Sequence, residues 1–563
     1  MGIPIPKEMT GKSLVVWLKI TFWPVNLRLF KEGFIKSKFR SIVLIILDGW
    51  GLSPTWGGNP ITMNNPANMT RYWREYPHKV LQAFTLLAGK YGVVGDSRLG
   101  HSTIAAGRRL VQDYEKISAS IEDKSFYKNK VFVDAIEHAK KNNSNIHLVG
   151  LLSNTGIHSH LNHLLALLDM AARENFERVF VDAISDGIDT GENDAVNFIE
   201  QIEQKFLRLN LAKFSSISGR FYAMDRDRDY QKTKKVYQAL VLGDAPLVRD
   251  PLAALTASYK QGLNDFLVMP TLTGEKKNTI SDNDAIIFFN FRSDRAIQLV
   301  QMMADPNFRL RFWRPKKLQN LYIATMTEYQ ADLPVKVAFP QPNVKNILPG
   351  VLSYYHKTQL RVAETEKTAH VTNFFNCGAN VFPGEERVIV SSKRVKKWDE
   401  APEMSAQKIT KVLVSAIERQ KYDFILANYA NVDMMAHTGN FTAAGVAVRK
   451  VDEEIGKVVA ANLKAGGATI ITADHGNVEQ IVKFKPKQDP ENKHTLNPVP
   501  FILINSENRK DLIRGALISS PQQLSKLIEV KASLADVAPT VLELMGLPKP
   551  AEMTGKSLLR NLE

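Results

Sequence analysis

The chain has 563 residues, of which 44% are hydrophobic and 23% charged, so a disordered or fibrous protein is excluded. At about 100–200 residues per domain, this length predicts two to four domains. The single cysteine, Cys377, excludes an internal disulfide and a cysteine-based zinc cluster, and it favours a reducing, cytoplasmic location. The net charge of +15 indicates an anionic partner, which is a nucleic acid, a membrane surface or a phosphorylated small molecule.

The first 40 residues carry a large part of this charge. They contain eight Lys and Arg but only two acids, which gives +6 of the +15. The apolar run at 14–30 is too short and interrupted to span a bilayer, which requires about 20 apolar residues. A basic segment with Trp17 and Trp23 can lie flat on an anionic membrane. We favour the other interpretation, a basic extension packed on the surface of the protein.

A short sequence occurs near both ends of the chain. Residues 8–14 read Glu-Met-Thr-Gly-Lys-Ser-Leu, and the same seven residues return at 552–558. Neither copy is a Walker A loop, because Pro6 and Pro550 stand where the first glycine of that loop is required. Our hypothesis is that the N-terminal copy preserves a C-terminal tail of this chain's own kind.

Beyond the extension, short continuous apolar runs alternate with helix-like stretches. Such runs are typical of parallel strands that are buried on both faces, so the sequence predicts an α/β fold. The predicted strands lie at 42–47, 146–152, 179–184, 285–289, 424–427 and 469–471. Several of them end directly in polar residues, and open α/β sheets bind their ligands at the carboxyl ends of strands.

Several of these polar residues have the chemistry of metal ligands. Asp433 and His437 are one helical turn apart, a spacing that places both on one face of a helix. Carboxylates and imidazoles without thiolates suit Mn²⁺, Mg²⁺ or Zn²⁺. One such pair is more often structural, but several at strand ends favour a two-metal centre. The candidate ligands are Asp48, Asp433, His437, Asp474, His475 and His494.

Ser97 is the candidate nucleophile. It lies in a glycine-flanked turn at 95–101 that leads into a helix-like stretch at 102–110. A nearby metal ion lowers the pKa of a hydroxyl, which is what a weak nucleophile of this type requires. Taken alone, a Gly-Asp-Ser sequence is more often only a turn.

A third group of residues is basic. Arginines at strand ends suit bidentate binding of phosphate or carboxylate, although each one alone is more often a solvated surface residue. The group comprises Arg220, Arg226, Arg292, Arg295 and Lys367.

Together these motifs resemble one family. They occur in its order at 47–51, 95–101, 157–160, 220–227, 290–295, 363–367, 428–433, 472–477 and 494–501. From about residue 41 to the end, the chain closely resembles the cofactor-independent (2,3-bisphosphoglycerate-independent) phosphoglycerate mutases of the alkaline phosphatase superfamily.

The resemblance implies two α/β domains. An alkaline-phosphatase-like, metal-binding domain at 41–112 and 345–563 would be interrupted by an inserted phosphotransferase domain at 118–338. Residues 113–117 and 339–344 would link them, and residues 1–40 would lie outside both. The site would lie in the cleft between the domains, so that domain closure gates turnover.

The resemblance also implies a ligand set and a reaction. One Mn²⁺ (or Mg²⁺, Co²⁺ or Zn²⁺) would bind Asp433, His437 and His494, and a second would bind Asp48, Ser97, Asp474 and His475. Ser97 would take the phosphoryl group of 3-phosphoglycerate and return it to give 2-phosphoglycerate, without 2,3-bisphosphoglycerate. Asp189 would act as general acid and base. The implied substrate residues are His158, Asp189, Arg220, Arg226, Arg292, Arg295 and Lys367.

The sequence departs from the family near this site. Ile188 stands where an arginine is expected, and Asp182 replaces a histidine. Asp96 and Arg98 change the charge on both sides of Ser97. Our hypothesis is that Arg98 partly compensates for the arginine missing at Ile188.

Three classes of function therefore compete. The first is a monomeric phosphoglycerate mutase with a small-molecule substrate and no nucleic-acid partner. The second is a metal-dependent phosphomonoesterase or phosphopentomutase-like enzyme that acts on another phosphate ester. The third is a non-catalytic basic protein that binds nucleic acid or membrane, but this class leaves the metal-type residues unexplained. The retained arginines favour the first.

Overall fold

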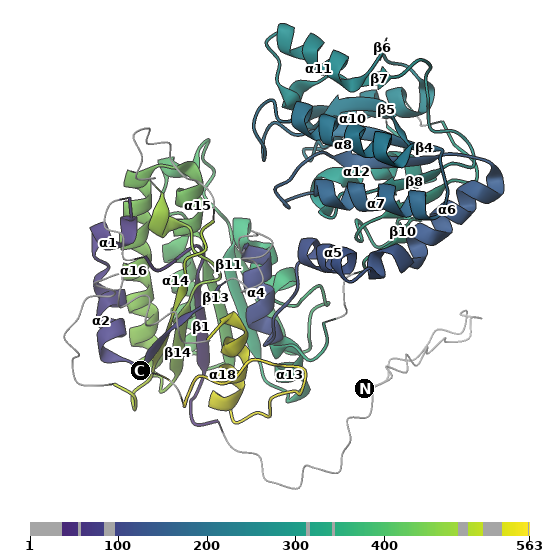
Figure 1. Ribbon diagram of the computed structural model, residues 1–563. Helices are drawn as coiled ribbons and strands as arrows, with labels where there is room; N and C mark the ends of the chain where they lie inside the picture. Colours follow the sequence, from purple (N-terminus) through teal and green to yellow (C-terminus); the bar gives the residue numbers. More distant parts are fainter. Residues whose placement is uncertain are drawn as a thin grey trace, which may run out of the picture.

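The computed structural model describes residues 37–53, 58–83, 96–310, 313, 316–340, 344–481, 494–509, 532–560 and 562. They form two α/β units, each built on its own sheet, which are drawn as separate lobes in Figure 1. Most of the predicted N-terminal extension, including the run at 14–30 and the first repeat copy, lies outside the described residues. Of the helices described, none combines the length and apolar character needed to cross a bilayer.

The first sheet gathers strands from both ends of the sequence. Its central strand β1 pairs in parallel with β13 and β14, while β15 runs antiparallel to both of its neighbours. In spatial order the described strands are β12 (Glu385–Val390), β11 (Gln359–Glu364), β13 (Phe424–Tyr429), β1 (Ile42–Leu47), β14 (Ala468–Thr472), β15 (Val499–Ile504) and β2 (His78–Leu81).

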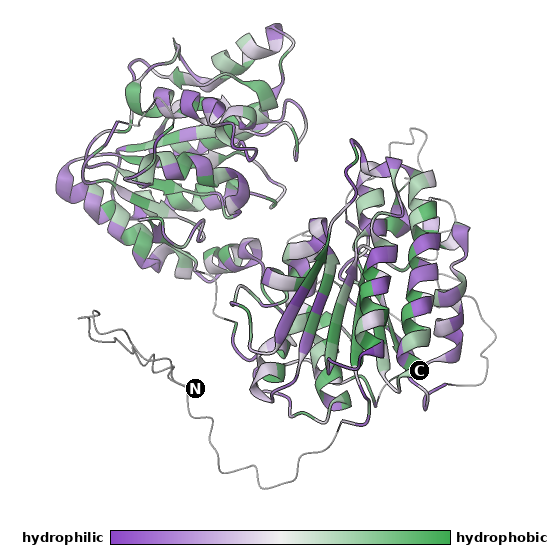
Figure 2. Cartoon of the chain, turned by 180° about the vertical axis from the view of Figure 1, so that it is seen from behind, coloured by the Kyte–Doolittle hydropathy of each residue, from purple (hydrophilic) through white to green (hydrophobic). Residues whose placement is uncertain are grey.

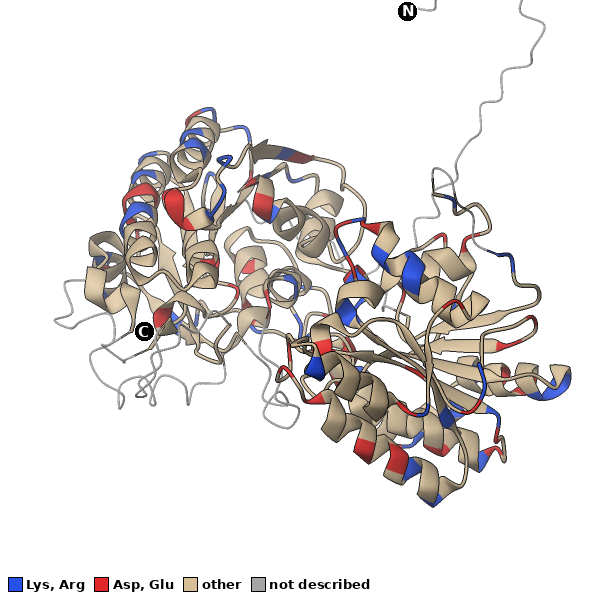
Figure 3. Ribbon diagram, turned by 90° about the horizontal axis from the view of Figure 1, so that it is seen from above, with Lys and Arg blue, Asp and Glu red and all other residues tan. Residues whose placement is uncertain are grey.

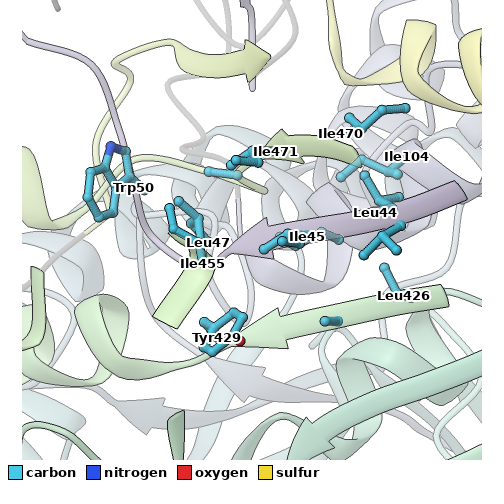
Figure 4. Packing of buried hydrophobic residues seen from close by; sticks show 14 of the residues in the cluster. Leu44, Ile45, Leu47, Trp50, Ile104, Leu426, Tyr429, Ile455, Ile470 and Ile471 are labelled. Atoms are coloured by element: carbon cyan, nitrogen blue, oxygen red, sulfur yellow. The ribbon is translucent and has the colours of Figure 1, made fainter. Parts of the chain in front are cut away.

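Strand β1 is the centre of the core of this unit. All six of its residues are buried, as expected for a continuous apolar run covered on both faces. Ile104 belongs to the same buried cluster as Leu44 and Ile470 (Figure 4). The helices around this sheet are α1 (Pro60–Asn64), α2 (Ala67–Glu75), α4 (Ser97–Ala106), α13 (Leu348–Tyr354), α14 (Ala406–Glu418), α15 (Asn431–Thr438), α16 (Phe441–Lys464) and α18 (Val537–Leu544).

Short single-turn helices complete the first unit, and three of them carry residues discussed below. They are η5 (Thr365–Lys367), η6 (His370–Phe374), η7 (Trp398–Glu400), η8 (Val478–Gln480) and η9 (Leu534–Asp536).

The C-terminal copy of the repeated sequence is part of this fold. Met553 is fully buried, and the amide of Gly555 donates to the carbonyl of Gly107, 2.9 Å away. The amide of Lys556 donates to Asp536 Oδ1 at 2.7 Å. This copy therefore packs against the C-terminal end of α4, the helix that begins at Ser97.

The second sheet belongs entirely to the segment between β2 and β11. Its strands are parallel except for β7 and β6, because β7 runs antiparallel to β5. In spatial order the described strands are β10 (Lys336–Val337), β9 (Tyr322–Thr325), β8 (Ala285–Phe288), β3 (Ile146–Leu151), β4 (Val179–Ser185), β5 (Lys213–Gly219), β7 (Thr271–Thr273) and β6 (Leu247–Val248).

Helices pack on this sheet as well. They are α5 (Asp113–Glu122), α6 (Lys130–Asn142), α7 (Leu161–Arg173), α8 (Ala195–Leu209), α9 (Arg220–Ala223), α10 (Tyr230–Tyr237), α11 (Pro251–Lys260) and α12 (Ser293–Ala304), with short turns η2 (Ser125–Lys128), η3 (Gln238–Leu242) and η4 (Asp265–Leu267). Apolar residues colour the strands of both sheets in Figure 2, and charged residues of both signs lie on the helices of both units in Figure 3.

The prediction of two α/β domains, one inserted into the other, agrees with these two sheets. All six predicted strands form, as β1, β3, β4, β8, β13 and β14. The first predicted linker is different, because 113–117 forms the start of α5 and Ile117 is fully buried. Of the second linker, 341–343 lie outside the described residues. Lys116 donates to the carbonyl of Pro340 at 2.8 Å, so the two connections are joined.

Candidate functional site

The carboxyl ends of three adjacent strands bring the acidic candidates together. Asp48 directly follows β1, and Asp474 and His475 follow β14. Because β1 pairs in parallel with β13 and β14, their carboxyl ends lie at one edge of the sheet. Asp48, Asp474 and His475 are each fully buried there. This is the edge at which α/β sheets bind ligands.

Asp433, His437 and His494 form the first donor group. Helix α15 carries Asp433 and His437 one turn apart, and Asp433 Oδ1 lies 3.3 Å from His437 Nε2. His494 Nε2 lies 3.7 Å from Asp433 Oδ1 and 3.2 Å from His437 Nε2. These three ligand atoms converge on one point, as the spacing of Asp433 and His437 predicts.

Ser97, Asp48, Asp474 and His475 form the second donor group. Ser97 Oγ lies 2.8 Å from His475 Nε2 and 3.3 Å from Asp48 Oδ1. His475 Nε2 is 3.6 Å from both Asp48 Oδ1 and Asp474 Oδ2. The candidate nucleophile therefore lies beside the carboxylates and imidazole that were expected to share a metal with it.

The turn before Ser97 differs from its prediction in one respect. Helix α4 starts at Ser97 rather than at residue 102, because the Asp96 side chain caps it by accepting from the Leu99 amide at 2.7 Å. The helix also approaches Asp474 closely. A Cβ atom on Gly100 would lie only 2.4 Å from the Asp474 carbonyl oxygen, so this position requires glycine.

Lys367, which was expected among the substrate residues, lies between the two donor groups. Its Nζ atom is 2.7 Å from Asp48 Oδ1, 2.7 Å from Asp433 Oδ2 and 3.4 Å from Ser97 Oγ. The side chain, which starts from η5, is buried. The ammonium therefore supplies positive charge to both carboxylates.

Burial and charge shift the pKa values of these groups in opposite directions. Burial and then the Asp474 charge raise the pKa of Asp48, against the effect of Lys367. Burial also opposes ionisation of Asp433, but Lys367 and His437 hold its pKa well below the usual range. Burial lowers the pKa of Lys367, and Asp433 and Asp48 more than reverse this, so it is raised. The group is thus a cluster of carboxylates balanced by cationic side chains.

The donor chemistry fits two divalent metal ions. Two sets of three residues, Asp433, His437 and His494, and Asp48, Asp433 and His475, each offer ligand atoms within 4.8 Å of one another. Asp474 Oδ2 is buried and accepts no full hydrogen bond, and His101 Nδ1 lies 3.2 Å from it, which leaves an electron pair available to an ion. Oxygen and nitrogen ligands without sulfur match Mn²⁺, Mg²⁺, Co²⁺ or Zn²⁺.

The predicted substrate residues of the second unit form a separate basic group. Arg220 begins α9 at the end of β5, and it is buried. Its Nη1 atom donates to Asp186 Oδ1 at 2.5 Å and to Asp189 Oδ2 at 2.7 Å. Burial opposes the charge of Arg220, but Asp189 and Asp186 raise its pKa above the usual value. The predicted acid–base residue is therefore held by an arginine.

His158 and three further arginines complete this group. His158 Nε2 is 3.8 Å from Asp189 Oδ2. Burial, followed by the charges of Arg220, Arg292, Arg295 and Arg226, lowers the pKa of His158 to about 2. Arg226 and Arg292 are exposed, whereas burial lowers the pKa of Arg295.

The two groups are separate in the structure. Within the described residues, the hydrogen bonds and ion pairs of His158, Arg220, Arg292 and Arg295 all end on partners of the second unit. Those of Asp48, Ser97 and Lys367 end on partners of the first.

Comparison with known proteins identifies a family that is consistent with this site. Residues 117–331 match the family model described as the N-terminal part of the BPG-independent phosphoglycerate mutases (PGAM). A 2,3-bisphosphoglycerate-independent phosphoglycerate mutase from Moorella thermoacetica is 41% identical over 525 residues, covering 92% of this chain and 98% of that protein. Its counterpart from Thermomicrobium roseum is 41% identical over 524 residues, with 92% and 98% covered. The chain belongs to this family.

A solved structure supports the same assignment. A Leishmania mexicana phosphoglycerate mutase, crystallised at low cobalt concentration, superposes with a TM-score of 0.70 at 26% identity, covering 92% of this chain and 97% of that one. The resemblance drawn from the motifs is therefore confirmed. The competing assignment as a phosphomonoesterase or phosphopentomutase-like enzyme receives no support from these relatives.

The departures from the mutase pattern have different structural settings. Ile188 is 57% exposed, so an apolar side chain faces solvent beside Asp189. Asp182 is buried in β4, where His147 Nδ1 lies 2.8 Å away and the hydroxyls of Ser215 and Ser216 donate to it. Neighbouring residues of the sheet therefore satisfy the Asp182 carboxylate, which stands where the family has a histidine. Arg98 is exposed on α4, and its compensation for Ile188 stays a prediction.

Several polar side chains around the mutase site were not among the predicted site residues. Asn477 donates to Asp433 Oδ1 at 2.8 Å, and Asn428 donates to Asp48 Oδ2 at 2.7 Å. His101 is fully buried beside Ser97 and Asp474. The sequence contains one indication that His101 belongs to the site. His101 follows Ser97 by four residues, so the two residues lie on the same face of a helix.

Proposed function

We propose that this chain interconverts 3-phosphoglycerate and 2-phosphoglycerate through a phosphoserine on Ser97. The observation that carries the proposal is the position of Ser97 Oγ, 2.8 Å from His475 Nε2 and 3.3 Å from Asp48 Oδ1 at the start of α4. A hydroxyl at a helix N-terminus lies where backbone amides stabilise a phosphate. Family membership supports the choice of substrate.

Two divalent cations would be held by this chain's own ligands. Asp433, His437 and His494 would hold one, and Asp48, Ser97, Asp474 and His475 the other; Mn²⁺ is our first choice, with Mg²⁺, Co²⁺ and Zn²⁺ as alternatives. When bound, they supply positive charge that neutralises the phosphate and lowers the pKa of the Ser97 hydroxyl.

Lys367 takes part in both halves of this arrangement. Its ammonium now balances Asp48 and Asp433 at 2.7 Å each. With divalent charge in the same place, the ammonium is no longer required by these carboxylates. Its Nζ atom, 3.4 Å from Ser97 Oγ, is then within reach of a phosphate oxygen on that serine. This supports the predicted role of Lys367 in substrate binding.

Asp189 and the arginines would act on the glycerate. Asp189 Oδ2 is fixed by Arg220 at 2.7 Å, which orients a carboxylate that can accept and return the proton of a substrate hydroxyl. Arg292, Arg295 and Arg226 offer planar donors that suit phosphate and carboxylate. A phosphoryl group that stays on Ser97 while the glycerate turns explains how one site exchanges two hydroxyls without 2,3-bisphosphoglycerate.

The reaction requires the two units to approach one another. The phosphoryl acceptor groups lie in the first unit and the acid–base residue in the second, so closure would assemble the site and exclude water. Excluding water keeps a mutase from becoming a phosphatase. We propose a cytoplasmic monomer, consistent with the single cysteine, and domain boundaries as predicted except at 113–117.

The test is an assay of full-length protein with 3-phosphoglycerate and Mn²⁺, without added bisphosphoglycerate. We expect chelator-sensitive formation of 2-phosphoglycerate, and a loss of about 10³-fold or more in Ser97→Ala, since removing a covalent nucleophile removes the whole route. Ser102→Ala is the matched control, because this serine on the same helix donates to the Phe374 carbonyl instead. Release of free phosphate without 2-phosphoglycerate would contradict the proposal.

A further inference from the structure

His101 lies among the predicted ligands but was not one of them. It follows Ser97 by one turn of α4 and is fully buried. With Asp48 and Asp474 it forms a third set of ligand-type atoms within 4.8 Å of one another. The set raises the question of whether His101 is itself a metal ligand or supports the residues that are.

The hydrogen bonds of the ring answer this question. Nδ1 lies 2.8 Å from the Ser97 carbonyl oxygen and 3.2 Å from Asp474 Oδ2. Both neighbours are acceptors, so Nδ1 carries the proton. A protonated ring nitrogen has no lone pair for a cation.

The other ring nitrogen is also engaged. Nε2 lies 3.0 Å from the amide nitrogen of Asn428, which also lies 2.7 Å from Asp48 Oδ2. A carboxylate accepts only, so the Asn428 amide must present its nitrogen to Asp48 and can donate its second proton to His101. Nε2 of His101 is therefore an acceptor, and both ring nitrogens are occupied by hydrogen-bond partners.

We infer that His101 and Asn428 are positioning residues for the second metal ion. They form a chain from Asp48 through Asn428 to His101, which ends at Asp474 and at the backbone of Ser97. Of the four proposed ligands of that ion, the network thus holds Asp48 by a hydrogen bond, faces Asp474 Oδ2 at 3.2 Å and contacts the backbone of Ser97. The inference rests on the two-metal site of the proposed function.

The first metal group has no share in this network. Its Asp433 is held by Asn477 at 2.8 Å, and its His437 and His494 contact each other and Asp433. Within the described residues, no hydrogen bond of His101 or Asn428 reaches these three. Loss of the network should therefore weaken one ion and spare the other.

The experiment is a Mn²⁺ titration of the full-length chain after its metal has been removed. Binding is measured by calorimetry and by the electron paramagnetic resonance signal of bound Mn²⁺. His101→Phe keeps the ring but removes both polar contacts. We expect one of the two Mn²⁺ affinities to fall about 10–100-fold, as is typical for loss of a residue that orients ligands, while the other changes less than about twofold. His101→Gln, which has both a donor and an acceptor, should recover most of the loss.

Two further variants separate positioning from folding. His370 packs edge-to-face on His101, with ring centroids 5.2 Å apart, so His370→Phe is the matched control and should leave both affinities unchanged. Asn428→Leu keeps His101 and should weaken the same ion as His101→Phe. It also replaces that variant if His101→Phe does not fold.

Equal weakening of both ions, or equal behaviour of His101→Phe and His101→Gln, would overturn the inference. Its failure is distinguishable from failure of the proposed function. A wild-type chain that binds two Mn²⁺ with this asymmetry but forms no 2-phosphoglycerate would overturn only the reaction. A chain that forms 2-phosphoglycerate but keeps both Mn²⁺ affinities when His101 is substituted would overturn only the positioning role of His101 and Asn428.

Discussion

The metal-ligand group of the first unit and the arginine group of the second are built in contrasting ways. Asp48, Asp474 and His475 are fully buried, and Lys367 joins Asp48 to Asp433 with two contacts of 2.7 Å. In the arginine group of the second unit, Arg220 is buried and paired with both Asp186 and Asp189. Arg226 and Arg292 are exposed.

The difference shows which contacts hold the side chains of each group in place. The metal-ligand group is organised by its own sheet, and Lys367 pairs with two of its carboxylates. The second group has one anchored arginine, Arg220, and two exposed arginines, Arg226 and Arg292, which we propose bind the substrate. We therefore expect mutations of the first group to affect stability strongly, and mutations of exposed arginines to affect binding.

The largest effect should come from Lys367→Met in metal-free protein. The substitution leaves Asp48 and Asp433 buried without their cation, and breaking a buried pair of this kind costs about 3–5 kcal/mol. Saturating Mn²⁺ should restore most of the loss, because it supplies the missing charge. Urea unfolding with a chelator and with Mn²⁺ measures both values, and an equal loss in both would show that Lys367 acts by packing alone.

A smaller effect should follow from the titration of His158 in acid. Its folded pKa is lowered to about 2 by burial and by the neighbouring arginines, below the ordinary value of 6.5. The unfolded chain therefore binds a proton below pH 6.5 that the folded chain does not, and stability falls as the pH falls. The loss should reach about 2 kcal/mol at pH 5.

His158→Asn tests this expectation by urea unfolding at pH 7 and pH 5. The variant should lose about 2 kcal/mol less than wild type over this interval. His356→Asn, at an exposed histidine of the first unit, is the control and should follow wild type. Parallel losses in wild type and His158→Asn would contradict the depressed pKa.

The smallest effect on stability should come from Arg226→Ala. The side chain is exposed, so the free energy of unfolding should stay within about 0.5 kcal/mol of wild type. Its KM for phosphoglycerate should rise about tenfold or more, because a charge-assisted contact to the substrate is lost. Steady-state kinetics beside urea unfolding give both numbers. A destabilised variant with normal KM would remove the contrast between the two groups.

The sequence predicts much of this arrangement because its signals are local. Strand β1 is six apolar residues followed by Asp48, and Asp433 and His437 reveal their shared helix face by spacing alone. One of the strands that were missed lacks such a signal. Strand β11 contains Arg361, whose guanidinium is fully buried against the rings of Phe375 and Phe424, 4.8 and 5.4 Å away. Only tertiary contacts make that charge acceptable in a central strand.

The same limit applies to the site. Lys367 was assigned to the substrate side, but its distances to Asp48 and Asp433 depend on residues more than 60 positions away in the chain. His101 looks like an ordinary helical histidine until Asn428 and Asp474 are placed beside it. The spacing of residues within one helix or strand can be read from the sequence. Contacts between different elements cannot, because they depend on the tertiary structure.

The pairing of β1 also determines the order in which this chain can be completed on the ribosome. Ile42 pairs with Phe424 on one side and Ala468 on the other, whereas every strand of the second sheet lies between residues 146 and 337. The inserted unit can therefore finish its sheet while β1 still waits for both neighbours. During that interval an unpaired apolar strand is open to association with other nascent chains. Protecting β1 through translation is the task this topology sets for chaperones.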